Sequence, residues 1–599
     1  MILKASTYIL KRAFKYNKKI FWSIACFIIA TGITPYMYMI LMAYIINAAE
    51  KGTEVKNAVL VVLSIICVGF VFNLIKSFFS NTQEALLNDY RQNEKRELIK
   101  KALSRSYQEL ETAEFWSMYQ RAQLSVQRNF SGNEGLLRNL IELCTSIIPF
   151  VLAIIAVREL DVIIIGIILL VAFVGNWLTF LADRLACQNQ IQLSRIYAKA
   201  DNFIHIMLNL SFQKDIRVSM AGRILKTKYR TLTIKITEEE EKIYKKNCKI
   251  RWTHDALLAI QDIVIYLILI HKYRNNEFDI AEWTLLISVM TMITFELSKI
   301  SQLLSQMKSN SNFVFEFKEF IEKENQKKKS VEYSSTRNMD HEPILRLENV
   351  DYFYREYQAL KRINLSINKG ERIAVVGLNG AGKSTLIKLI VGLYQPSAGD
   401  LYFMGQKTSI LNREEYYRHF ACAFQEINIY PYSLLTNVSL HSETETDAEK
   451  VLSLVKTMTS ESFVENMPKK EHTVLSRVLD NEGVELSGGQ KQAISLCRSF
   501  YRNSEVMILD EPTAALDPIA EKRIFEEINE LADGKTLIFV SHRLVSTMFC
   551  DKIVLLQNGS ILEYGTHEQL MSCNGVYAEL YKIQTSYYTS GESYGGSKC

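Results

Sequence analysis

Long apolar segments in the first 320 residues constrain the fold of this chain more than any other feature. Six of them stand out: Ile20–Ala49, Ala58–Ile75, Leu143–Val157, Val162–Ala182, Trp252–Ile270 and Trp283–Leu304. The first four contain no charged side chain, whereas the last two are apolar but carry charge. A helix needs about 20 apolar residues to cross the hydrocarbon core of a bilayer. Six such segments are too many for buried helices of a soluble protein, so we expect a polytopic α-helical membrane domain with six spans.

The distribution of Lys and Arg between these segments predicts the orientation of the chain in the membrane. The N-terminus and the long connections 84–138 and 183–251 are rich in Lys and Arg, whereas the alternate connections are short. Cytosolic loops carry the excess of positive charge. We therefore expect a multi-pass protein of the cell membrane, with the N-terminus, both long connections and the C-terminal half in the cytosol.

Three further stretches of the membrane half have a distinct pattern. Met1–Asn17 alternates basic and apolar side chains, which predicts an amphipathic helix on the membrane surface. The long connections read as helices that project into the cytosol, and each is interrupted once, at Tyr107–Met118 and at Ser211–Arg223. Capping residues in both interruptions favour a short transverse helix over an ordinary loop.

Composition excludes some classes of partner. There are 70 Lys and Arg residues against 65 Asp and Glu, and the resulting net charge of +5 demands no nucleic-acid partner. The ten cysteines are scattered without a C-x-x-C pair, so we expect reduced thiols rather than a zinc site or disulfides.

The chain divides by composition into four parts. Glu322–His341 is charged and almost devoid of apolar residues, as in a linker, and the last residues are rich in Ser, Gly and Tyr. The expected boundaries are a membrane domain over 1–321, a linker over 322–343, a soluble α/β domain over 344–585 and a disordered tail over 586–599.

The soluble half contains a glycine-rich loop, Gly377–Thr385, of the kind that binds phosphate groups. The loop follows the apolar run Ile373–Val376 and precedes the helix-like run Leu386–Val391, so it reads as a strand, a turn and a helix. Glycines let backbone N–H groups curl round a phosphate, and the helix N-terminus adds its positive dipole end. In this loop Lys383 would reach the β- and γ-phosphates of ATP, and Ser384 would ligate Mg²⁺. The expected nucleotide contacts are Gly377, Asn379, Gly380, Gly382, Lys383, Ser384 and Thr385.

Carboxylates and polar groups that suit hydrolysis follow other apolar runs. Val506–Glu511 is a strand ending in two carboxylates, of which Asp510 would hold Mg²⁺ and Glu511 would act as general base toward the attacking water. Gln425 would sense the metal or the water, and His542 would contact the γ-phosphate.

Three other elements complete the expected nucleotide site. Leu486–Gln490 starts a helix with a Ser and two glycines, which provides a second phosphate-capping device. Tyr354 precedes the phosphate loop and could stack on adenine. Contacts with nucleotide are expected from Ser487, Gly488, Gly489, Gln490 and Asp517 as well as from Tyr354.

With these elements in this order, the segment 345–585 resembles the nucleotide-binding domain of an ABC transporter. The sequence LSGGQ at Leu486–Gln490, between the phosphate loop and the Asp510-Glu511 strand, is highly specific for that family. The preceding 340 residues resemble the six-helix domain of type IV exporters, with an elbow helix and two coupling helices. The resemblance implies that ATP lies between Lys383 of one chain and Ser487 and Gly489 of another. A second copy or a related half-transporter is therefore the expected partner.

Three positions depart from the common family pattern. Ala514 stands where a Ser is usual, Asn481 where many exporters carry Glu, and Ala493 where a basic residue is common. Asn481 puts the usual contact with the coupling helices in doubt. None of the three touches the hydrolytic residues, so both sites of a homodimer are expected to be competent.

The sequence says less about the transported substrate. The chain is similar to bacterial peptide exporters, so we expect an amphipathic substrate such as a peptide, moved out of the cytosol by alternating access. Asp262 and Glu296 lie in apolar spans and are candidates for a central cavity, although each could instead pair or reach the interface. A lipid or drug exporter, an importer on an exporter-like fold, and one half of a heterodimer remain open alternatives.

Overall fold

The computed structural model describes residues 1–127, 131–156, 199–275, 280–323, 342–460, 462–478, 480–513 and 518–589, with separate positions between 166 and 197. The chain divides into two compact units. Unit 1 consists of Met1–Arg105 and Thr112–Asn325, and unit 2 of Ser106–Glu111 and Gln326–Cys599.

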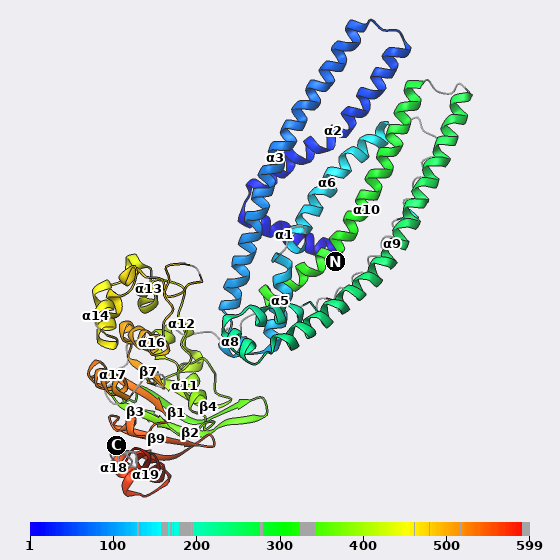
Figure 1. The fold of residues 1–599 in the computed structure, drawn as a ribbon. Helices are drawn as coiled ribbons and strands as arrows, with labels where there is room; N and C mark the ends of the chain where they lie inside the picture. The colour runs from blue at the N-terminus through cyan, green and yellow to red at the C-terminus, as the bar shows by residue number, and fades with distance from the viewer. Residues whose placement is uncertain are drawn as a thin grey trace. The chain divides into compact units, whose positions relative to one another are not determined.

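Unit 1 is built from long helices in its described part (Figure 1). They are α1 (Ile2–Tyr16), α2 (Lys19–Glu50), α3 (Val55–Leu103), α5 (Ala113–Gln127), α6 (Gly132–Ala156), α8 (Leu210–Val218), α9 (Gly222–Arg274) and α10 (Ile280–Glu322). Five segments are long and apolar enough to cross a membrane: Lys19–Glu50, Val55–Leu103, Ala113–Ile155, Gly222–Arg274 and Glu282–Glu322. The fourth span expected from the sequence, Val162–Ala182, lies outside the continuously described residues, so the expected count of six stays a prediction.

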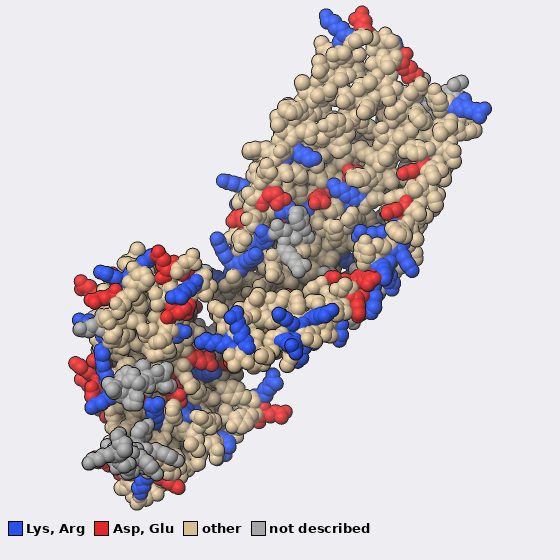
Figure 2. Space-filling model, in the orientation of Figure 1, with Lys and Arg blue, Asp and Glu red and all other residues tan. Residues whose placement is uncertain are grey.

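The surface of unit 1 is divided between apolar and charged regions. Large apolar side chains such as Leu60 and Phe70 on α3 are mostly exposed, as a lipid-facing surface requires. On the face in Figure 2, charged side chains are sparse over the apolar lengths of α2, α3, α9 and α10. Lys and Arg side chains gather over α8 and the first turns of α9, at the other end of the unit. At 53 residues, α9 is about 80 Å long, so it is long enough to cross a bilayer and extend well beyond it.

The amphipathic N-terminal segment forms the helix α1, but one of its basic side chains does not lie on the exposed face with the others. Lys4, Lys11 and Lys15 are exposed, and Ile9 and Ala13 pack into the core of unit 1. Arg12 instead points inward. Its guanidinium donates to Glu94 (2.7 Å) and to Glu97 (2.7 Å) on α3.

Both expected interruptions contain short helices, with different boundaries from the expectation. Tyr107–Met118 is not one helix, because α4 (Tyr107–Leu110) ends and α5 begins at Ala113. The Ser106 hydroxyl caps α4 by accepting a hydrogen bond from the Glu109 N–H. In the second interruption, α8 covers nine residues and ends at Val218.

Unit 2 contains two sheets. The larger has the order β10-β9-β3-β8-β7-β6, with β3 (Arg372–Val376), β6 (Phe420–Ala423), β7 (Val506–Asp510), β8 (Thr536–Ser541), β9 (Lys552–Gln557) and β10 (Ser560–Gly565). All its neighbouring pairs are parallel except β9 with β10. The smaller, antiparallel sheet has the order β2-β1-β4-β5, with β1 (Leu345–Tyr354), β2 (Tyr357–Ile367), β4 (Ala398–Phe403) and β5 (Gln406–Lys407).

Helices cover both faces of the larger sheet. They are α11 (Lys383–Ile390), α12 (Arg413–Arg418), α13 (Leu434–Ser439), α14 (Ala448–Met458), α15 (Ser462–Glu465), α16 (Gly488–Arg502), α17 (Pro518–Leu531), α18 (His567–Ser572) and α19 (Val576–Thr589). Short 3-10 helices are η1 (Thr408–Ile410), η2 (Glu443–Glu445), η3 (Lys470–His472) and η4 (Val545–Thr547). The last helix, α19, continues to Thr589, beyond the boundary expected at 585.

The larger sheet lies between two hydrophobic cores because alternate residues of a strand face opposite sides. Met507 and Leu509 of β7 belong to the core formed with α13, α14, α16, α17 and α19. Val506 and Ile508 belong to the core formed with α11 and the smaller sheet. Every residue of β7 and β8 is buried, which explains why these strands read as continuous apolar runs.

Candidate active site

The parallel strands place the candidate residues at one edge of the larger sheet. Strands β3, β6, β7 and β8 run in the same direction, so their carboxyl ends meet at the same edge. The phosphate loop follows β3, Gln425 follows β6, Asp510 and Glu511 lie at the end of β7, and His542 follows β8. Ligands of such sheets bind outside the carboxyl ends of the strands.

The backbone of the phosphate loop, Gly377–Thr385, requires glycine at two points. Gly377 has φ of 153°, and a Cβ there would lie 2.3 Å from the Leu556 carbonyl oxygen. Gly382, at the start of α11, has φ of 105°, and a Cβ would lie 3.0 Å from the Ala359 carbonyl oxygen. The loop therefore packs closely on neighbouring backbone, with its N–H groups at the N-terminus of a helix.

Lys383 lies across this loop. Its side chain is almost buried, and Nζ donates to the carbonyl oxygens of Gly377 (2.7 Å) and Leu378 (3.2 Å). Burial lowers the pKa of the Lys383 ammonium, and the carboxylates of Glu511 and Asp510 oppose that shift. Two carbonyl oxygens are weak partners for a buried cation, so phosphate oxygens could replace them readily.

The residues beside Lys383 fit a divalent cation. Asp510 is 8% exposed, and burial, with the negative charge of Glu511 as a second cause, raises its pKa to about 6 against the effect of Lys383. A carboxylate shifted in this way gains from a nearby positive charge. Ser384 is exposed in the first turn of α11, and its hydroxyl is the other oxygen ligand expected from the sequence.

Glu511 is held by its backbone in an unusual conformation. Its φ is 51°, in the left-handed region that residues other than glycine rarely adopt. Its N–H donates to the Val540 carbonyl (3.0 Å), and its own carbonyl accepts from Nε2 of Gln492 (2.9 Å). These two contacts, on β8 and α16, fix the backbone at the end of β7.

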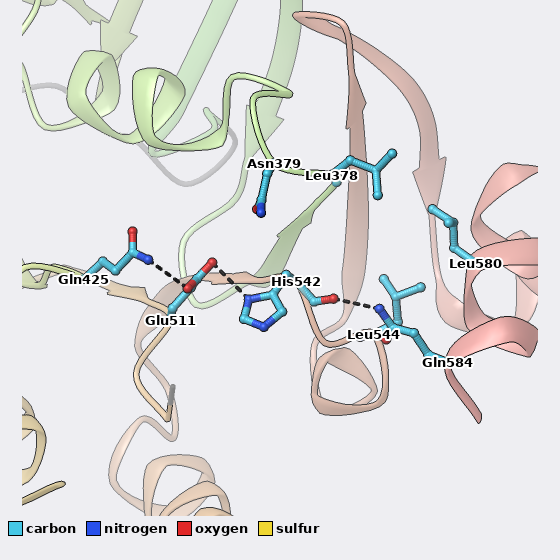
Figure 3. Close-up of a pocket in the computed structure, with 9 residues that line it drawn as sticks. Leu378, Asn379, Gln425, Glu511, His542, Leu544, Leu580 and Gln584 are labelled. Carbon is cyan, nitrogen blue, oxygen red and sulfur yellow. Dashed lines mark hydrogen bonds and ion pairs between the residues drawn. The ribbon is translucent and has the colours of Figure 1, made fainter. Parts of the chain in front are cut away.

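The Glu511 carboxylate lies between two polar side chains from neighbouring strands (Figure 3). Nε2 of Gln425 donates to one oxygen (3.1 Å), and Nδ1 of His542 lies 3.0 Å from the other. Gln425 is exposed, and the His542 side chain is 48% exposed. Three of the expected hydrolytic residues are thus in contact, and two of them are accessible to solvent.

A cavity of about 350 Å³ lies next to this triplet. Its lining residues are Gly377, Leu378, Asn379, Gln425, Glu511, His542, Leu544, Leu580 and Gln584. Figure 3 shows Asn379 and Leu378 of the phosphate loop on one side, and Leu544, Leu580 and Gln584 on another. The carboxylate of Glu511 and the phosphate loop therefore face a common space that could hold a phosphate group and a water molecule.

Tyr354 lies close to the phosphate loop. Its hydroxyl is 3.4 Å from Oγ1 of Thr385 and donates to the Tyr394 hydroxyl (3.2 Å). Its ring meets those of Tyr352 and Tyr394 edge to face, and the residue is 39% exposed. The ring is therefore accessible at the position where adenine stacking was expected.

The signature segment, Ser487–Gln490, lies apart from that cavity. Ser487 caps α16, because its hydroxyl accepts from the Gln490 N–H while the Gln490 side chain accepts from the Ser487 N–H (2.8 Å). Ser487 and Gly488 are exposed, and none of the cavity's lining residues comes from this segment. Asp517 and Ala514 lie outside the described residues. Ala493 is buried in α16, where a basic side chain would have to displace the core.

Several residues at the site were not identified from the sequence. Gln492 and Gln584 bind backbone groups of Glu511 and His542, and no motif marks them. In unit 2, Tyr394 donates to Glu111 (2.6 Å) and Lys388 lies 3.2 Å from the same carboxylate. These contacts connect the segment Ser106–Glu111 to the helix that begins with Lys383.

Comparisons with known proteins agree with this geometry. A family described as "ABC transporter" matches residues 360–514. The subtilin transport ATP-binding protein SpaT of Bacillus subtilis is 27% identical over 97% of this chain and 94% of its own length. The nisin transport ATP-binding protein NisT of Lactococcus lactis is 33% identical over 55% of each chain.

The fold of the whole chain also has a counterpart among solved structures. The ATP-bound structure of a bacterial Atm1-family ABC exporter matches with a TM-score of 0.79, covering 95% of this chain and 98% of that one at 18% identity. Both the long helices of unit 1 and the sheets of unit 2 are included in this match, which covers almost the whole chain. The chain therefore has the fold of an ABC exporter, in which a membrane domain is joined to an ATP-hydrolysing domain that matches the ABC transporter family.

Proposed function

We propose that this chain exports an amphipathic peptide from the cytosol, as a dimer driven by ATP hydrolysis. The observation that supports this most directly is the position of Glu511. Its carboxylate lies between Gln425 and His542 and faces the phosphate loop across the cavity. That arrangement suits hydrolysis of a phosphate anhydride more than binding alone.

The same residues suggest how nucleotide is bound. The ammonium of Lys383 leaves the carbonyls of Gly377 and Leu378 and contacts the β- and γ-phosphates, while the N–H groups of the loop surround them. The exposed ring of Tyr354 stacks on adenine. Ser384, Asp510 and Gln425 would hold Mg²⁺, which offsets the negative charge of the phosphates when bound.

Hydrolysis then depends on Glu511. Its carboxylate accepts a hydrogen bond from the attacking water and takes its proton as the water oxygen bonds to the γ-phosphorus. The bond from that phosphorus to the β,γ-bridging oxygen breaks, and ADP and phosphate leave. His542 lies on the other side of that carboxylate and contacts the γ-phosphate. Gln425 keeps the carboxylate directed toward the cavity.

A second chain completes each ATP site in this proposal. Ser487 and Gly489 lie at the exposed N-terminus of α16, where two N–H groups and the helix dipole suit a phosphate. They do not line the cavity that contains Glu511. A second copy of the chain, or a related half-transporter, would bring its own signature segment to the phosphate loop.

The ends of the helices and strands support the proposed domain boundaries, and the Lys and Arg side chains support the proposed orientation in the membrane. Because α10 ends at Glu322 and β1 begins at Leu345, a membrane domain over 1–321 and a linker over 322–343 are supported, whereas the nucleotide-binding domain extends beyond 585 to the end of α19 at Thr589. The Lys and Arg side chains over α8 and the start of α9 favour a cytosolic position for that end, together with the N-terminus.

The relatives support a peptide as the substrate. SpaT matches along 97% of this chain, including the membrane domain where a substrate would bind, and its name gives subtilin transport. NisT carries the corresponding name for nisin.

Transport into inside-out vesicles tests the proposal. Labelled subtilin and nisin serve as probes beside a labelled phospholipid and a fluorescent dye. We expect ATP-dependent accumulation of a peptide, abolished by Glu511→Gln. Accumulation of only the lipid or the dye contradicts the peptide assignment, and uptake only by right-side-out vesicles loaded with ATP reverses the direction.

A further inference from the structure

The last helix of the chain contributes a side chain to the catalytic cavity. Gln584, on α19, is half-buried and lines the cavity together with Leu580. Its Nε2 donates to the carbonyl oxygen of His542 (2.8 Å), and its Oε1 accepts from the N–H of Leu544 (2.8 Å). One side-chain amide therefore binds the backbone on both sides of Arg543, and Figure 3 shows its bond to the His542 carbonyl.

The base of α19 is fixed to the rest of unit 2. The Glu563 carboxylate on β10 accepts from the N–H groups of Val576 (2.7 Å) and Tyr577 (3.1 Å), at the N-terminus of the helix. Tyr577 is fully buried, and its hydroxyl lies 2.8 Å from Nδ1 of His567. Gln584 is seven residues beyond Tyr577, about 10 Å along a helix whose position is set by the core.

The segment after β8 also has contacts of its own around Arg543, whose carbonyl accepts from the Ser546 hydroxyl (2.7 Å). The Ser541 hydroxyl accepts from the Arg543 N–H (2.9 Å), and the Arg543 guanidinium pairs with Glu521. The Ser541 contact holds the N–H side of the peptide group between His542 and Arg543, and among the described hydrogen bonds the carbonyl side of that group is bound by Gln584. The imidazole itself is half-exposed, with Glu511 on one side. The Gln584 amide is placed to set the orientation of the peptide group that follows His542.

We infer that Gln584 is a positioning residue for ATP hydrolysis, which holds His542 against Glu511 from the C-terminal helix. This inference rests on the role proposed above for His542. A displacement of about 1 Å can cost a catalytic constellation up to about 100-fold in rate. The loss of two neutral hydrogen bonds outside the reacting atoms should cost less, about 10-fold in kcat.

Steady-state ATP hydrolysis by the purified full chain tests the inference. Gln584→Met keeps the size of the side chain and removes both hydrogen bonds, whereas Gln584→Glu keeps the acceptor and removes the donor. The matched control is Lys582→Met, on an exposed residue of the same helix whose ammonium contacts only the side chain of Asn574 among the described hydrogen bonds (3.0 Å). We expect both Gln584 variants to lower kcat, by about 10-fold for Met, with KM for ATP within about twofold and Tm equal to that of the control.

A double-mutant cycle separates positioning from a general structural role. In a His542→Ala background, the slow residual hydrolysis is followed over hours, and Gln584→Met should lower it by less than about twofold. An equal loss in both backgrounds, or normal kcat in both Gln584 variants, overturns the inference. Full activity of His542→Ala refutes the role of His542 and this inference with it. The assay needs no transported peptide, so it does not depend on the export proposal.

Discussion

The two units hold their charged side chains in different ways. In unit 1, the Glu94 carboxylate is fully buried and accepts from Arg12 (2.7 Å) and Asn133 (2.7 Å). In unit 2, the Glu511 carboxylate is 13% exposed, and its side-chain partners are an amide and a half-exposed imidazole. A desolvated ion pair keeps its partners because separating them leaves a buried charge uncompensated, whereas a carboxylate with solvent-accessible partners can exchange them.

This difference separates fixed contacts from those that change during turnover. Arg12 and Glu94 join α1 to α3, and breaking that pair would leave a buried charge without compensation. Lys383 and Glu511 contact groups that phosphate oxygens and water could replace at little cost. In this comparison the adaptable polar contacts lie at the edge of the larger sheet, and the fixed ones lie between α1 and α3.

The largest expected effect is that of Glu511→Gln. An amide cannot accept the proton of the attacking water, so hydrolysis should fall by about 100- to 10,000-fold while ATP binding persists. Turnover and nucleotide binding are measured on the same purified sample. Glu505→Gln makes the same change on a half-exposed residue just before β7 and should leave the rate unchanged. Near-normal turnover by Glu511→Gln contradicts its role as the base.

Arg12→Met tests the fixed contacts of unit 1. It leaves the Glu94 carboxylate buried with only Asn133 as a strong donor, so we expect a loss of about 3 to 5 kcal/mol of stability. Thermal unfolding in detergent measures this. The control is Lys242→Met, which removes a solvent-exposed pair with Glu239 and should leave the unfolding temperature almost unchanged. Equal shifts of the unfolding temperature in Arg12→Met and Lys242→Met would show that burial of the Arg12 pair does not contribute to stability.

Lys383 and Tyr354 of unit 2 are expected to contact different parts of ATP, the phosphates and the adenine, with different strengths. Lys383→Ala removes a charge-assisted contact with the phosphates and should weaken ATP binding by about 10- to 100-fold. Tyr354→Ala removes stacking on adenine and should weaken it by about 3- to 10-fold. Tyr354→Phe keeps the ring and loses the bonds to Thr385 and Tyr394, so it should bind almost normally. A titration in which the Tyr354→Ala loss equals or exceeds that of Lys383→Ala contradicts these roles.

The sequence predicted best the parts of the site that depend on local geometry. The phosphate loop needs glycine because of its own backbone angles, and Ser487 caps α16 through a residue three positions later. Apolar runs likewise marked the strands that Asp510 ends and His542 follows. Each of these features is set by neighbours in the sequence and could be read before the structure was known.

Contacts between distant segments could not be predicted in this way. Gln584 reaches His542 across 42 residues, and the contact depends on how α19 packs against β10. The inward direction of Arg12 depends on α3 in the same way, because the alternation of α1 alone places it on a basic face. Such contacts follow from tertiary packing and leave no local pattern in the sequence.

The smallest expected effect concerns the membrane charges of unit 1. Glu296 on α10 is 6% exposed, beside Ser146 on α6, whereas Asp262 on α9 is only partly buried. A carboxylate at membrane depth is costly unless it faces a polar group or a cavity. If Glu296 faces the substrate, Glu296→Gln should change peptide-stimulated ATP hydrolysis by about 2- to 5-fold through one altered hydrogen bond.

The measurement separates this effect from the chemistry of unit 2. Basal hydrolysis should stay constant in Glu296→Gln and in Asp262→Asn, since neither carboxylate lies in the nucleotide-binding unit. Glu50→Gln, on an exposed residue at the end of α2, provides the same amide substitution away from the helix interior. If the peptide stimulates ATP hydrolysis equally in Glu296→Gln, Asp262→Asn and the unaltered chain, neither residue contacts the substrate. The assignment of the hydrolytic site does not depend on that result. If these variants instead lower basal and stimulated hydrolysis equally, polar contacts in unit 1 also change during turnover. That result would contradict the comparison between fixed contacts in unit 1 and adaptable contacts in unit 2.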